Sequence, residues 1–383
     1  MQFLMLLATP GPTELHKRVL DAMCKQVVSH RGPELRELYT SLVEKFRKLL
    51  KTDGSVFVLA CSATGGIECA VSNIINKGDK VLSPVFGVFS ERFAEAAKFY
   101  GAEITYLNIK PQTAPTPEII KGALDEGTYD VALLVYNETS TGVASRDFHE
   151  ILKACKERNV LVAVDAVSAA GGLPLKIDSW GIDICVIGSH KCYAGPPGLS
   201  IITVSEDAWN KIRSSRRPFY FDLIKYKKFY EENRETPFTP AVNLMYGMNE
   251  ALNIVLEYGA DNWMRRHMDF ANSIYEVLEK ANVKLFAEKE YRSPTTISIS
   301  LPNNVTDSEI IEELRIKHGV VVAGGMGNMK GSLIRVANMG NLSVEKTVKV
   351  YDAILDVMSF KVDGINRQAV EALGESLRKM GYR

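Results

Sequence analysis

Two ionisable residues follow apolar segments of the kind that form buried strands. Asp165 ends the run VLVAVD, and Lys191 follows ICVIGSH and opens onto the turn AGPPG. A third apolar run, SVFVLAC, leads into the turn SATGG (62–66), after which a helix is expected to begin near Ile67. Hydroxyls and free amides at a helix start can bind a phosphate. Taken singly, each feature is equally typical of a structural role, such as a helix cap or a surface lysine.

Taken together, the three features match what pyridoxal 5′-phosphate (PLP) requires of a protein. Its aldehyde needs an amine that can lose a proton, and its ring nitrogen needs a carboxylate that keeps it protonated. Its phosphate needs donors near a helix dipole. No G-K-[ST] follows residues 62–66, so the turn is not a Walker loop. A PLP site is therefore the leading hypothesis.

These residues need a scaffold that brings strand ends together. Apolar, β-branched runs alternate with amphipathic helical stretches, and several runs are apolar at nearly every position. Strands covered by helices on both faces have this pattern. We predict an α/β domain with a mostly parallel seven-stranded sheet, which binds ligands at the carboxyl ends of its strands. The predicted strands are residues 55–61, 80–85, 103–109, 131–137, 160–167, 184–189 and 200–205.

The pattern changes after these strands. The charged, aromatic segment 213–240 has no clean period, and we interpret it as a solvated excursion or a subunit contact. A helical stretch over about 241–280 follows, and further strands are predicted at 295–302, 319–324 and 332–338. We predict two domains: a large PLP-binding domain, residues 1–255, with segment 1–15 near the substrate pocket, and a smaller carboxyl-terminal α/β domain, residues 256–383.

Composition excludes several classes of function. The 383 residues hold 46 Lys plus Arg and 46 Asp plus Glu, so the chain does not have the excess of positive charge typical of a nucleic-acid binder. No apolar run reaches the roughly 18–20 residues that span a bilayer. The six cysteines form no C-x-x-C and no metal-ligand spacing, which favours reduced thiols in the cytoplasm and no metal site.

Six segments resemble a known family, the class V aminotransferases of PLP fold type I. The likeness is greatest to serine–pyruvate and alanine–glyoxylate aminotransferases, and it covers nearly the whole chain in the right order. The segments are ATPGPT (8–13), SHRGPELRELY (29–39), NETSTGV (137–143), VDAVSAAGG (164–172), GSHKCYAGPPGLS (188–200) and IRVANMG (334–340).

The resemblance implies a role for each matching residue of the coenzyme site. Lys191 would bind the coenzyme's aldehyde covalently and then move the substrate proton, and Asp165 would pair with the ring nitrogen. Thr139 would donate to the ring's 3′-oxygen, and Val167 would pack against one ring face. The phosphate would be held by Ser62, Ala63 and Thr64.

The resemblance also implies a substrate site and a partner. Arg335 would bind the substrate carboxylate through both nitrogens of its planar guanidinium, and the backbone around Gly11 would border the substrate pocket. Thr239 would reach the phosphate in a neighbouring subunit, so that a homodimer with shared active sites is expected. His30 and Arg31 are expected to be structural.

The chain departs from the nearest members of this family at three positions. Phe89 stands where they have a ring-stacking Trp, and it can still stack with less area. His190 stands where they have Gln; it could donate to the phosphate and, if protonated, would help to lower the pKa of Lys191. Thr236 aligns with a Tyr that they bring from the other subunit, which leaves that phosphate contact open.

The implied reaction is a ping-pong transfer of the amino group of serine or alanine to pyruvate or glyoxylate. A cysteine desulfurase or selenocysteine lyase is one alternative, but no cysteine follows Cys192. A 2-aminoethylphosphonate aminotransferase shares the fold, and no phosphonate pocket is apparent. A nucleotide-dependent dehydrogenase is disfavoured because the glycine-rich segment 324–331 fails G-x-G-x-x-G at Lys330. A catalytically idle scaffold is disfavoured by the consistent placement of Lys191, Asp165 and Arg335.

Overall fold

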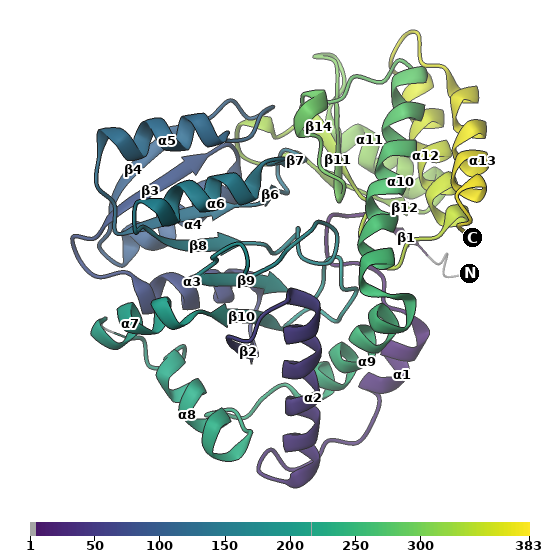
Figure 1. Ribbon diagram of the computed structural model, residues 1–383. Coiled ribbons are helices and arrows are strands. Elements are labelled where there is room, and N and C mark those ends of the chain that lie inside the picture. Colours follow the sequence, from purple (N-terminus) through teal and green to yellow (C-terminus); the bar gives the residue numbers. More distant parts are fainter. Residues whose placement is uncertain (1–4, 216) are drawn as a thin grey trace.

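A seven-stranded sheet organises the larger part of the molecule, whose computed structural model describes residues 5–215 and 217–383. The strand order is β2-β10-β9-β8-β5-β3-β4. Strand β10 is antiparallel to both neighbours, and every other pair is parallel. The predicted α/β fold is therefore confirmed (Figure 1). The strands are β2 (Ser55–Leu59), β3 (Lys80–Val85), β4 (Glu103–Asn108), β5 (Val131–Val135), β8 (Leu161–Asp165), β9 (Ile184–Gly188) and β10 (Ser200–Val204).

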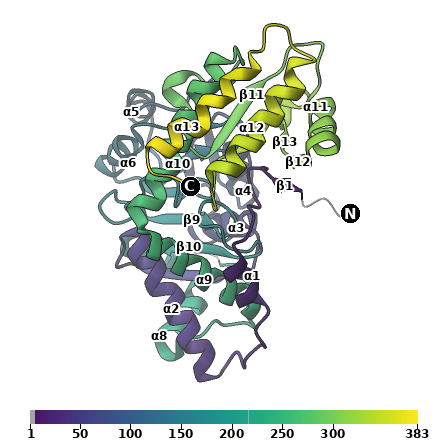
Figure 2. The same cartoon turned by 90° about the vertical axis from the view of Figure 1, so that its right-hand side faces the viewer.

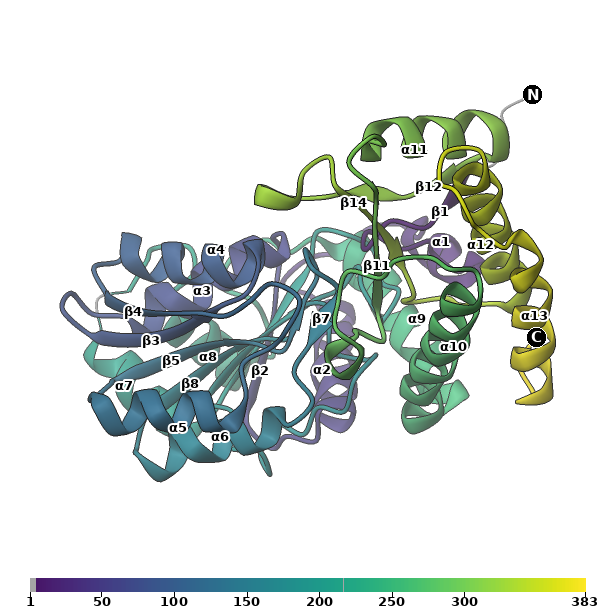
Figure 3. The same ribbon diagram turned by 90° about the horizontal axis from the view of Figure 1, so that it is seen from above.

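Helices cover both faces of this sheet. Viewed from above, α3 and α4 lie over one face, and α5 and α6 lie over the other (Figure 3). Every residue of β5, β9 and β10 is buried, as the continuous apolar runs predict, whereas most of the edge strand β4 is exposed. The helices of this part are α1 (Lys17–Met23), α2 (Pro33–Leu50), α3 (Ala63–Ile74), α4 (Val88–Phe99), α5 (Pro117–Glu126), α6 (Phe148–Glu157), α7 (Glu206–Ser214), α8 (Leu223–Asn233) and α9 (Val242–Tyr258).

A smaller, three-stranded sheet organises the carboxyl-terminal part (Figures 1 and 2). Its central strand, β14 (Leu333–Ala337), pairs antiparallel with β11 (Thr296–Ser300) and with β13 (Ala323–Gly324). The predicted strand 319–324 is therefore divided, because its first half forms β12 (Val320–Val321), which pairs with β1 (Leu6–Leu7). The helices here are α10 (Ala260–Lys280), α11 (Asp307–Glu313), α12 (Val344–Ser359) and α13 (Glu371–Lys379), with short helical turns at Lys289–Tyr291, Leu314–His318, Gly327–Met329 and Arg367–Val370.

The predicted helical stretch 241–280 is interrupted at Gly259, which lies between α9 and α10 with φ of 89°. Glycine adopts this backbone conformation without a Cβ penalty, so the chain changes direction there. One buried hydrophobic cluster reaches Trp263 in α10, and a second begins at Phe270 in the same helix. The second cluster also includes Ala8, so the start of the chain packs with its end. The domain division at residue 256 stays a prediction.

The described residues include neither a membrane-spanning helix nor a cluster of metal ligands. No helix of the described chain is both long and apolar enough to cross a membrane. Within the same residues, no group of three or more His, Cys, Asp or Glu side chains could hold a metal ion.

Candidate active site

A cavity of about 210 Å³ lies at the carboxyl ends of the parallel strands. Turns that follow β2, β3, β5, β8 and β9 supply its wall, so residues far apart in sequence meet there. The structure thereby brings together every predicted coenzyme residue except Thr239, and it adds Asn137. The lining residues are Ser62, Ala63, Thr64, Phe89, Asn137, Thr139, Asp165, Val167, His190 and Lys191.

The turn after β2 forms the start of α3 and opens on this cavity. The helix begins at Ala63, so the prediction of a start near Ile67 was wrong. Ser62 is the N-cap, and its Oγ accepts a hydrogen bond from the amide of Gly65 at 3.3 Å. The first intrahelical bond runs from Gly66 N to Ser62 O, which leaves the amides of Ala63 and Thr64 ahead of it. Those amides and the helix dipole favour an anion at this end of the cavity.

Lys191 follows β9 and is only 7% exposed. Burial lowers its pKa from 10.5 to about 8, and the charge of Arg335 acts in the same direction. Its Nζ donates to the carbonyl of Pro10. Gly11 packs directly against it, because a Cβ at that position would lie 2.7 Å from Lys191 Nζ. Segment 8–13 therefore borders the lysine, and the place of Gly11 beside the substrate pocket stays a prediction.

Asp165 ends β8 and is 6% exposed. Burial raises its pKa from 3.8 to about 7, and a hydrogen bond of 2.8 Å from the amide of Val167 partly offsets that rise. A cation placed beside it would favour the ionised form. The carboxyl is thus suited to a partner that carries positive charge, such as a protonated ring nitrogen.

His190 is neutral at neutral pH. Burial lowers its pKa to about 4, and the charge of Lys191 acts in the same direction. In the protein without a bound anion, the pKa of Lys191 is therefore lowered by burial and by Arg335, without help from a protonated His190. His190 Nδ1 is buried without a hydrogen-bond partner among the described residues, so it can still interact with a bound group.

Asn137 and Thr139 form a polar network that sequence analysis found only in part. Thr139 Oγ1 donates to Ser168 Oγ at 2.7 Å, and Asn137 Nδ2 donates to Ser168 Oγ at 2.7 Å and to Thr295 Oγ1 at 3.1 Å. Asn137 Oδ1 is buried without a partner in the described chain. The signal that could have found Asn137 is its place at the head of NETSTGV, as the last residue of the predicted strand 131–137.

The residues present fit PLP. The cavity offers amides at a helix start, a lysine with a lowered pKa after β9, and a buried carboxyl at the end of the neighbouring strand β8. Two buried polar atoms, His190 Nδ1 and Asn137 Oδ1, have no protein partner among the described residues. Native proteins seldom leave such atoms unpaired, so the pair points to a polar group that binds here.

Arg335 stands on β14 of the smaller sheet and reaches across to Thr139. Its Nε donates to Gly324 O at 2.8 Å and its Nη1 donates to Thr139 O at 3.2 Å. Nη2 has no acceptor within the described residues, and the side chain is largely buried. The guanidinium is therefore held in place from both parts of the molecule while one of its nitrogens remains available to an anion.

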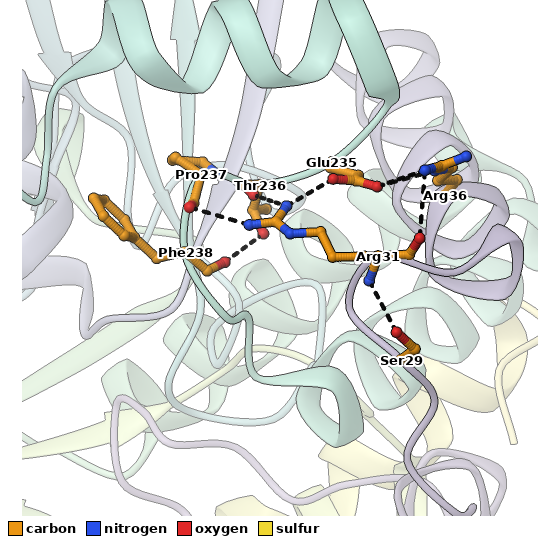
Figure 4. Close-up of polar contacts among 7 residues, drawn as sticks. All are labelled: Ser29, Arg31, Arg36, Glu235, Thr236, Pro237 and Phe238. Atoms are coloured by element: carbon orange, nitrogen blue, oxygen red, sulfur yellow. Dashed lines mark hydrogen bonds and ion pairs between the residues drawn. The ribbon is translucent and has the colours of Figure 1, made fainter.

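The loop after α8 carries Thr239, which is exposed and lies outside the cavity lining. Figure 4 shows that Arg31 holds this loop through Glu235 and through the carbonyls of Thr236 and Pro237. The expectation of a structural role for Arg31 agrees with these contacts. Thr236 is buried, and its hydroxyl donates to Phe238 O at 2.7 Å, so it is engaged inside its own loop.

Comparisons with known proteins agree on one family. The family model "Aminotransferase class-V" matches residues 5–371. An uncharacterized aminotransferase of Methanocaldococcus jannaschii is 40% identical over 98% of this chain and 98% of its own length. Serine–glyoxylate aminotransferase of Methylorubrum extorquens is 32% identical, with 88% and 87% covered. The crystal structure of ureidoglycine–glyoxylate aminotransferase from Bacillus subtilis has a TM-score of 0.92 at 27% identity, with 98% and 99% covered.

Proposed function

The chain belongs to the class V aminotransferases and is a transaminase, and we propose that it is PLP-dependent and moves the amino group of serine or alanine to pyruvate or glyoxylate. The observation that carries the proposal is that Lys191, Asp165 and the first residues of α3 line the same cavity. The serine–glyoxylate and ureidoglycine–glyoxylate aminotransferases described above both have glyoxylate in their names, which supports a small 2-oxo acid as acceptor.

Each coenzyme-site residue has a distinct task in this mechanism. When bound, PLP supplies an aldehyde that takes up an amino group and a ring that accepts the electron pair of the substrate Cα. Lys191, with its lowered pKa, would provide an amine for covalent attachment, and it would then move the proton from the substrate Cα to the coenzyme's aldehyde carbon. Asp165 holds a proton on the ring nitrogen. Phe89 and Val167 would contact the two ring faces, and residues 62–64 would bind the phosphate.

In this mechanism a single cationic side chain, Arg335, would bind the substrate. Arg335 Nη2 would bind the α-carboxylate of the amino acid, and later that of the 2-oxo acid. Arg335 approaches the cavity from β14 through its contact with Thr139, and the described residues that line the cavity include no arginine. A donor with a distal carboxylate would then bury a charge without a partner, which is unfavourable. This supports serine and alanine over aspartate and glutamate.

The exposed position of Thr239 supports a homodimer with shared active sites. In a single chain this residue lies outside the cavity, so a contact with coenzyme phosphate requires a second subunit. The loop that carries it is held by the contacts of Arg31, which favours one fixed loop conformation.

Single-turnover reactions of the PLP-loaded protein test this function. We expect serine and alanine to discharge the visible absorbance of the coenzyme faster than glutamate does. Lys191→Ala is the matched control, which should bind PLP weakly and show no turnover. The proposal fails if the wild-type protein acquires no visible absorbance with PLP, or if glutamate reacts faster than both small donors.

A further inference from the structure

Glu138 is a fully buried carboxylate, 0% exposed, in the short strand β6 (Asn137–Glu138), which forms a hairpin with β7 (Val143–Ala144). It lies between Asn137 and Thr139, both of which line the cavity, but Glu138 itself does not. None of the ion pairs within the described chain includes it. A buried carboxylate without a cation is costly unless hydrogen bonds compensate its charge.

The compensation comes from the start of α4, the helix that carries Phe89. Glu138 Oε1 accepts from the amide of Phe89 at 3.2 Å, and Oε2 accepts from the amide of Ser90 at 2.8 Å. Ser90 Oγ also lies 3.1 Å from Oε2. These amides belong to the first turn, where no intrahelical acceptor exists and the helix dipole favours a negative charge. Glu138 therefore caps α4 from a distant segment of the chain.

The same carboxylate also binds the turn that follows Thr139. Oε1 accepts from Ser140 Oγ at 2.6 Å and from the amide of Ser140 at 3.1 Å. Ser140 Oγ in turn accepts from the amide of Val88 at 2.9 Å. The approach is so close that a Cβ on Gly87 would lie 2.4 Å from Glu138 Cγ. Phe89 and Thr139 are thus fixed relative to one another through a single side chain.

We propose that Glu138 is a positioning residue, which sets Phe89 against the coenzyme ring and holds the Thr139 turn in place for the coenzyme. This inference rests on the proposed function. Every group within reach of the two carboxylate oxygens is an N–H or O–H donor. A carboxylate is the only side-chain group of this shape with two acceptor oxygens and no donor. A glutamine would turn its NH₂ group toward donors on one side or the other.

The charge of Glu138 also reaches the reacting groups. It adds to the effect of burial in raising the pKa of Asp165, and it opposes the effect of burial on the pKa of Arg335. The side chain thus lies within electrostatic range of both residues that would face the coenzyme and the substrate, in agreement with a functional placement rather than a remote packing role.

The decisive measurement is the affinity of the apoprotein for PLP, together with the visible circular dichroism of the bound coenzyme. Glu138→Gln should weaken PLP binding about tenfold, since roughly 1.4 kcal/mol corresponds to one lost hydrogen bond in a buried network. It should also reduce the visible dichroism, which reports how rigidly the ring is held. The matched control is Glu157→Gln, an exposed glutamate at the end of α6, which should change neither quantity.

A double-mutant cycle tests whether the effect passes through Phe89. In a Phe89→Leu background, Glu138→Gln should weaken PLP binding by less than tenfold, because the Phe89 ring is already absent and only the effect through the Thr139 turn remains. Independent effects that simply multiply would overturn the proposal. So would a Glu138→Gln protein that is less stable but keeps the wild-type affinity and dichroism.

Ser140→Ala covers the case in which Glu138→Gln does not fold. It removes only one hydroxyl contact to Glu138 and one acceptor for Val88, so the protein should fold. We expect PLP binding to weaken only about threefold, because the amides of Phe89, Ser90 and Ser140 still hold Glu138 in place; an unchanged affinity contradicts the proposal. If wild-type protein does not bind PLP at all, the proposed function fails instead, so the two failures are distinguishable.

Discussion

Replacing Lys191 with methionine is expected to stabilise the apoprotein while it abolishes turnover. The lysine is 7% exposed, and its only hydrogen-bond acceptor among the described residues is the carbonyl of Pro10. Methionine has a similar length, no charge and a flexible side chain that fills irregular space. The substitution therefore removes a buried charge without leaving a cavity.

The expected gain follows from the lowered pKa of Lys191. Its pKa falls from 10.5 in the unfolded chain to about 8 in the folded protein, so the unfolded chain holds the proton more tightly. At about 1.4 kcal/mol for each pKa unit, the charged amine destabilises the fold by about 3 kcal/mol below pH 8. That cost decreases as the pH rises from about 8 to 10.5, because only the unfolded chain still binds the proton there.

Urea unfolding of the two apoproteins at several pH values measures this difference. Lys191→Met should exceed the wild type in unfolding free energy by about 3 kcal/mol near pH 7, reduced by up to about 1 kcal/mol for the lost hydrogen bond. The difference should shrink to about 1 kcal/mol near pH 10. Lys176→Met, at an exposed lysine, is the matched control for the same change of side chain at a solvated position.

A pH-independent difference would refute the reasoning, because it would show that Lys191 has an ordinary pKa in the folded protein. A methionine variant less stable than the wild type at both ends of the pH range would also contradict it. Either result would remove the physical basis for a neutral amine at this position.

Three further substitutions test neighbouring groups. The carboxyl of Asp165 has a pKa raised from 3.8 to about 7, so stability falls from about pH 4 to 7, because the unfolded chain releases this proton while the folded protein still holds it. Asp165→Asn should raise the unfolding free energy of the apoprotein by up to about 4 kcal/mol above pH 7 and by nothing near pH 4, as measured by urea unfolding. Gly11→Ala should slow covalent PLP attachment, followed by absorbance, at least about tenfold, because its Cβ would lie 2.7 Å from Lys191 Nζ. Gly78→Ala, at φ of +86° with nothing within 4 Å, carries the same backbone strain and should leave attachment unchanged; equal slowing in both would contradict the contact. Arg335→Gln should raise the KM for alanine about a hundredfold in steady-state kinetics, since a charge-assisted carboxylate contact contributes about 1.5–3 kcal/mol; an unchanged KM would exclude Arg335 as the carboxylate ligand.

Local patterns were sufficient for the sheet and for its strand-end residues. Strands enclosed by two helical layers must be apolar at every position, so an ionisable residue at the end of such a run is conspicuous, as with Asp165 and Lys191. Local patterns were misleading at the start of α3, where glycines disfavour a helix and a serine cap favours one. The glycines after Thr64 suggested a late helix start, but the Ser62 cap supplies the acceptor that lets α3 begin at Ala63.

Contacts between distant segments could not be read from spacing. Residues 319–324 form two strands because the first half pairs with β1 and the second half pairs with β14. Arg335 keeps one nitrogen available to an anion because its other donors bind the carbonyls of Gly324 and Thr139. Nothing in the sequence indicated a role for Glu138, because its contacts with the first turn of α4 exist only in the folded chain.

The order of apolar and charged residues along the chain was thus enough to predict the α/β fold, a site at the carboxyl ends of the strands, and Asp165 and Lys191 as its ionisable residues. These predictions were possible because apolar runs and periodicity are local features of the sequence. The pKa values of Lys191, Asp165 and His190, and the capping of α4 by Glu138, required the assembled molecule. Desolvation and hydrogen bonding depend on every atom that surrounds a group in space, and most of those atoms come from other parts of the chain.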